Sequence, residues 1–545
     1  MDELAALARD YLDDLARRHP DDATELGDHR FDAHLPDLSA DALADERQVL
    51  SGFARRVAGL DLTTLSPEQR VDAAMLAGHA ELRAFELDEL REHQWNPLRA
   101  NPGRSVYLLL ARDFAPLPDR LIAVAGRLSE VPGLLAAARS HLAAMPKVHM
   151  ETAITQFDGT IKLVSDVIDR ALAQATPSLV AEIEGVRPTA LEALAEHRDW
   201  LSARLADGSM AGGGVPAYAD PRLGPDKHAR KLSLTLQAQA DSAAILARAE
   251  ADLERVTEEI TELAGSLGGP PREVLDRLAA DAPDGGTILR FCAGAFAAQT
   301  AFVRELDLVT LYDDPVAIID MPEIDRGVAV AYCDPPGPLE SAALATFIAV
   351  SPVPADWSAE RAASFYREYN RHMIHNLMAH EATPGHFLQL AHARRFSGSG
   401  TDLRAALWSG AFVEGWAVYC EELMAAHGYP GEGDPRAIRM QQLKMQLRMI
   451  INAILDARVH AHGMTEDEAM ALMTGPGFQE DGEAAGKWRR AQLTSVQLST
   501  YYVGYTEVAD LARELLAAPG ATEREVHDRI LAHGSPPVRL LRTVV

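Results

Sequence analysis

The sequence predicts a mainly α-helical protein with one small β-sheet. Alanine- and leucine-rich segments repeat apolar residues at helical spacing over most of the chain. The strand-like runs are few, short and bounded by proline and glycine. A hydrophobic content of 47% over 545 residues is typical of a globular protein rather than a disordered one. We expect two helical lobes around a deep central groove.

The helical pattern begins at the N-terminus. The predicted helical segments are residues 2–19, 41–60, 66–92, 104–145 with interruptions at Pro116 and Pro132, and 155–206. The stretch from Gly208 to Asp226 contains three consecutive glycines and three prolines, so it is the clearest loop or linker. Residues Leu232 to Leu267 then read as one long helix.

Three short runs after Leu311 are predicted to be strands: Val316–Asp320, Gly327–Cys333 and Ala345–Ser351. We expect Ala345–Ser351 to be the edge strand, which could pair with an extended peptide by backbone hydrogen bonds; the alternative is a buried structural strand. Helices resume at Ser358. The predicted division is an N-terminal helical lobe, 1–310, and a C-terminal lobe, 311–545, carrying the sheet and the site, unless both form one integrated domain.

The heptapeptide from His380 to His386 holds two histidines and Glu381, the residue types of a zinc hydrolase. On a regular helix, a spacing of six residues would turn the second imidazole about 240° from the first and carry it ~9 Å along the axis. Pro384 and Gly385 interrupt a regular helix, however, and allow a kink that swings His386 back. The alternative is a helix that ends at Thr383, with two unrelated histidines.

A third metal ligand is expected on a later helix. Glu414 is the only acidic residue in an apolar run before Cys420, and a charge there is costly unless it is paired or bound to a metal. The alternative is that Glu414 lies in the first turn of a helix, where the helix macrodipole favours an acidic side chain. Glu421 and Glu422 read as solvated charges, although Glu421 could orient a ligand.

The segments His380–Gln389 and Glu414–Ala417 resemble the bacterial family DUF885, a domain of unknown function whose members are similar to gluzincin zinc metallopeptidases. More distantly, the chain is similar to helical zinc peptidases of the angiotensin-converting-enzyme and oligopeptidase type. Further matching segments are Pro20–His29, Pro336–Leu339, Asp456–His460 and Tyr501–Gly504. Residues 487–492 and those around Tyr332 match only loosely.

The resemblance implies a zincin-like fold, in which the small sheet lies next to the metal helix. It also implies one Zn²⁺ per chain held by His380, His386 and Glu414, with Glu381 as general base. Such a donor set leaves a position for water, whose pKa zinc can lower to about 7.

A tyrosine from a late helix stabilises the oxyanion in similar enzymes. Tyr501 is the first candidate and Tyr505 the second, because the two share a helical face. The alternative for both is a core-edge tyrosine with a hydrogen-bonded hydroxyl.

Asp456 and His460 also share a helical face. They could orient ligands or contact substrate, but neighbouring basic residues favour an i,i+4 surface pair.

Charge and composition narrow the possible partners. The formal net charge of −28 argues against nucleic acid and against an anionic membrane surface. Three widely spaced cysteines fit a reducing compartment. The N-terminus is acidic, without a signal-peptide pattern, and we find no apolar run of membrane-spanning length. These features predict a cytoplasmic protein.

The predicted function is hydrolysis of peptide or peptide-like amide bonds in short substrates. One alternative is a zinc hydrolase of a non-peptide amide or ester. The other is a non-catalytic helical binding protein with a degenerate metal site.

Overall fold

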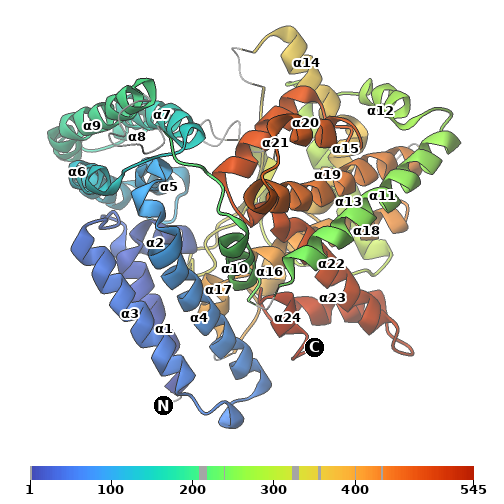
Figure 1. The fold of residues 1–545 in the computed structure, drawn as a ribbon, viewed down its shortest axis with the longest axis horizontal. Coiled ribbons are helices and arrows are strands. Elements are labelled where there is room, and N and C mark those ends of the chain that lie inside the picture. Colours follow the sequence, from blue (N-terminus) through green and yellow to red (C-terminus); the bar gives the residue numbers. More distant parts are fainter. Residues whose placement is uncertain are drawn as a thin grey trace. The chain divides into compact units, whose positions relative to one another are not determined.

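The computed structural model describes residues 3–207, 218–237, 240–321, 331–353, 357–398, 400–430 and 434–545 (Figure 1). The chain forms two compact units. Unit 1 comprises residues 1–65, 76–223 and 336–344, and unit 2 comprises 66–75, 224–335 and 345–545. Residues 224–310 thus belong with the later part of the chain. The predicted glycine-rich stretch 212–214 and strand residues 327–330 lie outside the described residues.

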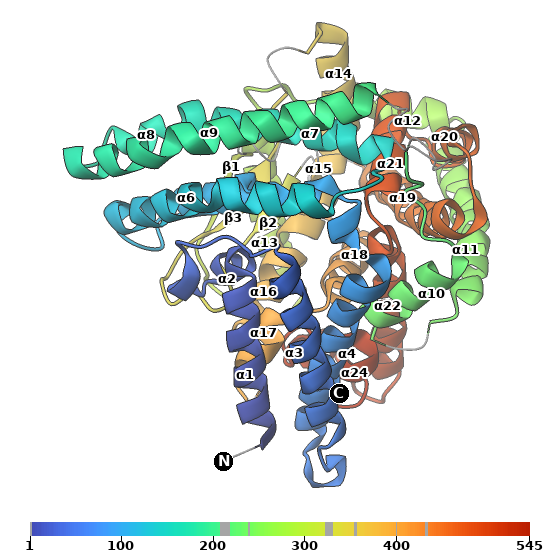
Figure 2. The same ribbon diagram turned by 60° about the vertical axis from the view of Figure 1, so that its left-hand side comes forward.

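Unit 1 is built from helices (Figure 2). They are α1 (Glu3–Arg18), α2 (Pro20–Leu26), α3 (Ala40–Ala58), the end of α4 (Pro67–Phe85), α5 (Gly103–Ala111), α6 (Leu117–His141), α7 (Lys147–Lys162), α8 (Asp169–Leu172) and α9 (Pro177–Ala206). Helix α6 packs along α9, as Figures 1 and 2 both show. The predicted interruption at Pro132 is wrong, because α6 continues through it. Buried Leu128, Val131 and Leu135 around the proline offset its local cost.

Helix α6 also corrects the expectation that no segment is long and apolar enough to cross a membrane. By length and composition Leu117–His141 is such a helix, and 56% of its most apolar window is buried inside the structure. Burial of this kind is also found in core helices of proteins without a membrane span.

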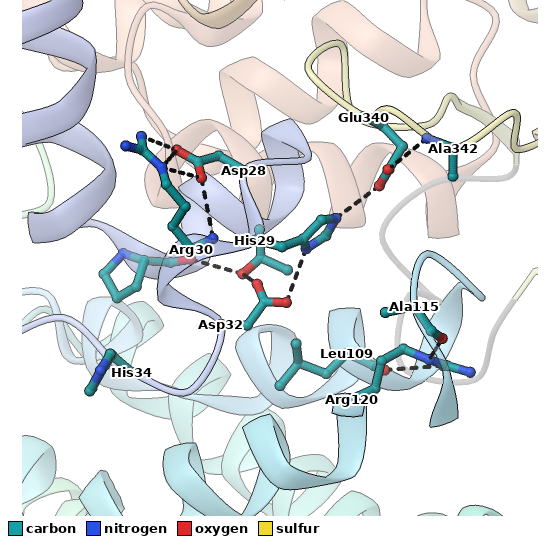
Figure 3. Close-up of polar contacts among 12 residues, drawn as sticks. Asp28, His29, Arg30, Asp32, His34, Leu109, Ala115, Arg120, Glu340 and Ala342 are labelled. Atoms are coloured by element: carbon teal, nitrogen blue, oxygen red, sulfur yellow. Dashed lines mark hydrogen bonds and ion pairs between the residues drawn. The ribbon is translucent and has the colours of Figure 1, made fainter. Parts of the chain in front are cut away.

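A polar cluster in unit 1 joins α2 to the segment 336–344 (Figure 3). His29 lies between two carboxylates: its Nδ1 is 3.0 Å from Asp32 Oδ2 and its Nε2 is 2.8 Å from Glu340 Oε2. The turn at Gly27 has a φ of +88°, and a Cβ there would lie 2.5 Å from the backbone nitrogen of Glu340. The N-terminal segment and the segment 336–344 are therefore packed backbone against backbone.

Unit 2 contains the sheet and the remaining helices. Its elements, besides the start of α4, are α10 (Pro225–Thr235), α11 (Ser242–Ser266), α12 (Pro271–Ala279), α13 (Ile288–Glu305), β1 (Val316–Asp320), β2 (Ala331–Asp334), β3 (Thr346–Val350), α14 (Ala359–Glu368), α15 (Arg371–Glu381), α16 (His386–Ala393), α17 (Thr401–Ala406), α18 (Gly410–Ala426), α19 (Pro435–His462), α20 (Glu466–Thr474), α21 (Asp481–Leu493), α22 (Gln497–Leu516), α23 (Glu523–Leu531) and α24 (Val538–Leu541). Its largest apolar core joins α11, α18, α19 and α22. The predicted mainly α-helical fold with a small sheet is confirmed.

The predicted single helix from Leu232 to Leu267 is two helices, α10 and α11. A new helix starts at Asp241, because the side chain of this residue accepts hydrogen bonds from the backbone N–H groups of Ala243 and Ala244. Gln237, just after α10, has a φ of +47°, which is outside the right-handed helical region.

The three described strands form one sheet in the order β1-β3-β2. Strand β1 is parallel to β3, and β2 is antiparallel to β3. The prediction that residues 345–351 form the edge strand is wrong, because β3 has a partner on each side. Strand β2 is an edge strand of the described sheet.

Helices α18 and α22 cross with their backbones in contact. A Cβ on Gly415 would lie 2.2 Å from the carbonyl carbon of Gly504, and a Cβ on Gly504 would lie 1.8 Å from the carbonyl oxygen of Ala411. Only glycine fits at both positions, so the crossing depends on this pair.

We predict that Gly415→Ala lowers the free energy of unfolding by about 1–3 kcal/mol, since backbone atoms cannot move aside as a side chain can. Thermal denaturation measures the effect as a lower midpoint. Gly486→Ala on α21 is the matched control: nothing lies within 4 Å of its Cβ position, so its midpoint should equal or slightly exceed that of the wild type. An unchanged midpoint for Gly415→Ala would contradict the close crossing.

Candidate metal centre

The backbone breaks between the two histidines of the heptapeptide, as predicted. Helix α15 ends at Glu381 and α16 begins at His386. Between them Ala382 has φ −117° and ψ −100°, and Gly385 has φ −72° and ψ −133°, both non-helical. A Cβ on Gly385 would lie 1.9 Å from the carbonyl oxygen of His380, so only glycine permits this turn.

The break brings the two imidazoles together. Their ring centroids are 4.7 Å apart and the rings are nearly perpendicular, at 87°. A residue of α18 (Gly410–Ala426) holds the connecting turn, because Trp416 Nε1 donates a 2.9 Å hydrogen bond to the carbonyl oxygen of Pro384. The helix ends close to Thr383, as the alternative had it, but the two imidazoles lie next to each other.

Helix α18 brings Glu414 to the same point. The side chain of Ser409 caps this helix by accepting a hydrogen bond from the backbone N–H of Phe412. The helix therefore starts at Gly410. Glu414 Oε2 is 3.5 Å from Nε2 of His380 and 3.5 Å from Nε2 of His386. One ligand atom from each of the three residues lies within 4.8 Å of the others.

Two buried atoms of this group have no hydrogen-bond partner in the protein: Glu414 Oε2 and His386 Nδ1. Buried polar atoms are nearly always paired, and a carboxylate oxygen that faces two imidazoles without a hydrogen bond is a donor set into which a cation would fit. The three side chains remain 10–22% exposed, which leaves the group open to a small ligand.

The charges of the three residues are strongly linked. Burial alone would raise the pKa of Glu414, but the two nearby imidazoles, each 3.5 Å from its Oε2, hold it well below its ordinary value. Burial alone would lower the pKa of His380, but Glu414 and Glu421 hold it well above its ordinary value. A cation at this point would replace these protons.

Glu421 orients His380 from behind. Its Oε1 is 2.7 Å from His380 Nδ1, and its Oε2 accepts a 2.5 Å hydrogen bond from Asn376 Nδ2. Tyr429 completes the group by donating to Asn376 Oδ1 at 2.8 Å. Glu421 is 3% exposed, so its expectation as a solvated charge is wrong, because α18 packs this face against α15.

Sequence reasoning did not identify Asn376 or Tyr429. Asn376 lies four residues before His380, on the same face of α15, which was the available signal. No signal of this kind marked Tyr429.

Glu381, the predicted base, lies at the end of α15 and is 8% exposed. Its Oε2 accepts a 2.9 Å hydrogen bond from the backbone N–H of Cys333 on β2. Burial raises the pKa of this carboxyl group, against the opposing effect of His380 and His386. Edge strand β2 thus fixes the orientation of Glu381.

Tyr505, the second oxyanion candidate, is engaged elsewhere. Its hydroxyl donates to Glu422 Oε2 at 2.7 Å and accepts from Gln446 Nε2 at 3.2 Å. Glu422 lies on α18, about two turns beyond Glu414, and Gln446 lies on α19.

Tyr501, unlike Tyr505, is affected by the charge of Glu414. Burial, with a further contribution from the negative charge of Glu414, raises the pKa of Tyr501 to about 12. Its hydroxyl accepts from Arg490 Nη2 at 3.3 Å and from Gln497 Nε2 at 3.4 Å. The structure therefore separates the environments of the two tyrosines that the sequence grouped together.

Asp456 is not a surface residue. It is fully buried, and its carboxylate accepts from the backbone N–H of Val496 at 2.8 Å and from Ser499 Oγ at 2.5 Å, while His228 Nε2 lies 3.1 Å away. These bonds fix the start of α22, where Val496 has a φ of +70°. Asp456 thereby positions the helix that carries Tyr501.

His460 is likewise buried, at 2% exposed. Its Nε2 lies 2.9 Å and 2.8 Å from the carbonyl oxygens of Ala491 and Thr494. The surface-pair reading of Asp456 and His460 is wrong, because their partners come from distant segments that a local pattern does not reveal.

Comparison with known proteins identifies the chain's relatives. A protein of unknown function from Shewanella oneidensis, described as a candidate lipoprotein, has a solved structure with a TM-score of 0.84, 28% identity, and coverage of 99% of this chain and 98% of its own. A candidate lipoprotein from Colwellia psychrerythraea shares the fold, with a TM-score of 0.79, 17% identity and the same coverage. No curated protein matches the chain. The model of a family of bacterial proteins of unknown function, DUF885, matches residues 20–545, and the chain belongs to this family.

Proposed function

We propose that this protein is a zinc-dependent hydrolase that cleaves peptide or peptide-like amide bonds of short substrates. One observation carries the proposal: two imidazoles and a carboxylate converge within 4.8 Å, and the buried carboxylate oxygen between them has no hydrogen-bond partner. Two histidines and one glutamate form a catalytic zinc donor set, which leaves a coordination position open.

His380, His386 and Glu414 would hold the metal. When bound, a zinc ion there would supply a Lewis acid for the substrate carbonyl and lower the pKa of water. Glu421 holds the Nδ1 side of His380, so that the Nε2 lone pair of this residue is directed at the metal position. The orientation of a ligand by a carboxylate is a common arrangement around metal-binding histidines.

Glu381 is placed to move the proton. It follows His380 directly, and the N–H of Cys333 fixes one of its carboxylate oxygens. In the proposed reaction its carboxylate takes a proton from the attacking water and gives it to the leaving amine. Tyr501 would donate a hydrogen bond to the oxyanion, a role that a buried phenol with a raised pKa can perform because it stays protonated.

The choice of substrate class rests on the donor set and on the resemblance to zinc peptidases. The N–H of Cys333 on β2 fixes Glu381 beside the three candidate ligands, where it could serve an amide carbonyl. We therefore favour a peptide over the alternatives of a non-peptide amide or an ester. A binding protein with a degenerate metal site is disfavoured by the complete donor set.

The cellular location is a separate proposal. The sequence analysis led to the expectation of a cytoplasmic protein, whereas the two structural relatives are described as candidate lipoproteins. We propose, from the likeness to these two relatives, that the protein is lipid-anchored or secreted. Fractionation of the native cells distinguishes this location from the cytoplasm.

We predict that purified wild-type protein binds close to one zinc ion per chain and that His386→Ala and Glu414→Gln each lose most of it. Replacing one of three ligands removes a donor that the other two cannot replace. Elemental analysis after dialysis gives the stoichiometry. His372→Ala, on the same helix as His380, is the control and should keep the metal. Equal zinc content in all four proteins would exclude this donor set.

We further predict that Glu381→Gln keeps its zinc but loses at least ~100-fold in kcat, the range expected for removal of a general base. The amide keeps the shape and the hydrogen bond of the side chain without its basicity. Kinetics on a panel of short peptides, with elemental analysis of the same samples, measures both quantities. Full turnover in this variant would remove Glu381 from the role of base.

Tyr501→Phe and Tyr505→Phe discriminate between the two oxyanion candidates. We predict a loss of roughly 100-fold in kcat for Tyr501→Phe, since one oxyanion donor contributes on this scale. Tyr505→Phe should change kcat little, because its hydroxyl bonds Glu422 rather than the site. The reverse ranking in steady-state kinetics would overturn the assignment.

A further inference from the structure

Four basic side chains are buried or half-buried on two helices, Lys444 and Arg448 on α19 and Lys487 and Arg490 on α21, and Arg490 contacts Tyr501. Two of them are matched by carboxylates: Lys444 Nζ is 2.6 Å from Glu368 Oε2, and Arg448 pairs with Glu483. The remaining two are Lys487 and Arg490, which we name the cation pair.

Neither member of the cation pair is in ion-pair contact with an acid; Glu483, one helical turn before Lys487, exerts its charge on Lys487 but is paired with Arg448. Within the part of the chain that the structure describes, no carboxylate oxygen lies within 4.0 Å of either side chain. Lys487 is nevertheless only 6% exposed. Arg490 Nη2 contacts neutral groups, Gln497 Oε1 at 2.9 Å and the Tyr501 hydroxyl at 3.3 Å.

An unmatched buried ammonium is costly. Burial, together with the charges of Arg448 and Arg490, lowers the pKa of Lys487 well below its ordinary value. An isosteric methionine would avoid this cost, so a purely structural role does not account for lysine at this position. The chain as a whole has a net charge of −28, which makes a local surplus of two cations a departure from its general character.

The cation pair adjoins the candidate metal centre through Tyr501. Arg490 donates to the hydroxyl of Tyr501, and the charge of Glu414 acts on the same hydroxyl. Arg490 is therefore in contact with the phenol, and Lys487 lies three residues before Arg490 on the same face of α21. A substrate group held by the cation pair would lie next to the bond that is cleaved.

We propose that Lys487 and Arg490 bind a carboxylate of the substrate and hold it beside Tyr501. This inference rests on the proposed function and adds a substrate class to it, namely short peptides that carry a free carboxylate near the scissile bond. Arginine offers a planar fork and lysine a point charge, and one carboxylate can accept hydrogen bonds from both. The carboxylate could come from the peptide's C-terminus or from an acidic side chain.

Binding without turnover tests the inference. Isothermal titration of the Glu381→Gln protein, loaded with zinc, would use three probes: acetyl-Ala-Ala-Ala as the free acid, the same peptide as its C-terminal amide, and acetyl-Ala-Glu-Ala amide. We expect the free acid to bind at least ~10-fold more tightly than the plain amide, the scale of a charge-assisted hydrogen bond. Tight binding of the glutamate peptide instead would identify a side-chain carboxylate as the source.

The variants Lys487→Met and Arg490→Met, made in the same background, should each bring the acid and amide affinities close to equality while zinc content stays unchanged. Arg513→Met is the control, because Arg513 is an exposed residue of α22 paired with Asp510. Lys487→Met should also raise the thermal midpoint, since it removes an unmatched buried charge. A structural lysine would change the midpoint without changing the acid preference.

Three results would overturn the inference: equal affinity for all carboxylate and amide probes, no binding of any probe, or an acid preference that survives both methionine variants. Failure of the proposed function is a different outcome. It would appear as selective binding of the acid that depends on Lys487, together with no hydrolysis of any peptide by the wild-type protein.

Discussion

The candidate site depends on one steric constraint, the close approach of Gly385 to the last turn of α15. A Cβ at this position would lie 1.9 Å from the carbonyl oxygen of His380, so no other residue allows the chain to fold back there. Without the turn, six residues of regular helix would direct the two imidazoles apart. With it, their ring centroids lie 4.7 Å apart, and every other group of the site is arranged around that point.

A second close approach organises the rest of the site. Gly415 and Gly504 let α18 and α22 cross in backbone contact, so Glu414 and Tyr501, one residue before the first glycine and three before the second, lie near the same crossing. Asp456 fixes the start of α22, and Glu421 ties α18 to His380. Glycines therefore set the distances between helices, while buried carboxylates set their register and orient the ligands.

The sequence predicted those features that depend on neighbours in the chain. Helical periodicity, three strand segments, the break at Pro384-Gly385 and the isolated acid Glu414 were all visible in local patterns. Features that depend on distant segments were missed. Strand β3 lies in the centre of the described sheet because of the strand order. Glu421 is buried because α18 packs against α15. Asp456 is buried because its partners come from α10 and α22. Pro132 stayed within α6 because surrounding apolar contacts outweigh its local effect.

X-ray absorption at the zinc edge tests the central claim most directly, because it reports the atoms bound to the metal rather than their effect on activity. The account predicts one zinc ion with two imidazole nitrogens and additional oxygen ligands, all at about 2.0–2.2 Å. His386→Ala should lose one of the imidazole contributions. A sulfur shell at about 2.3 Å, or a spectrum with a single imidazole in the wild-type protein, would contradict the convergence of His380 and His386 on one ion.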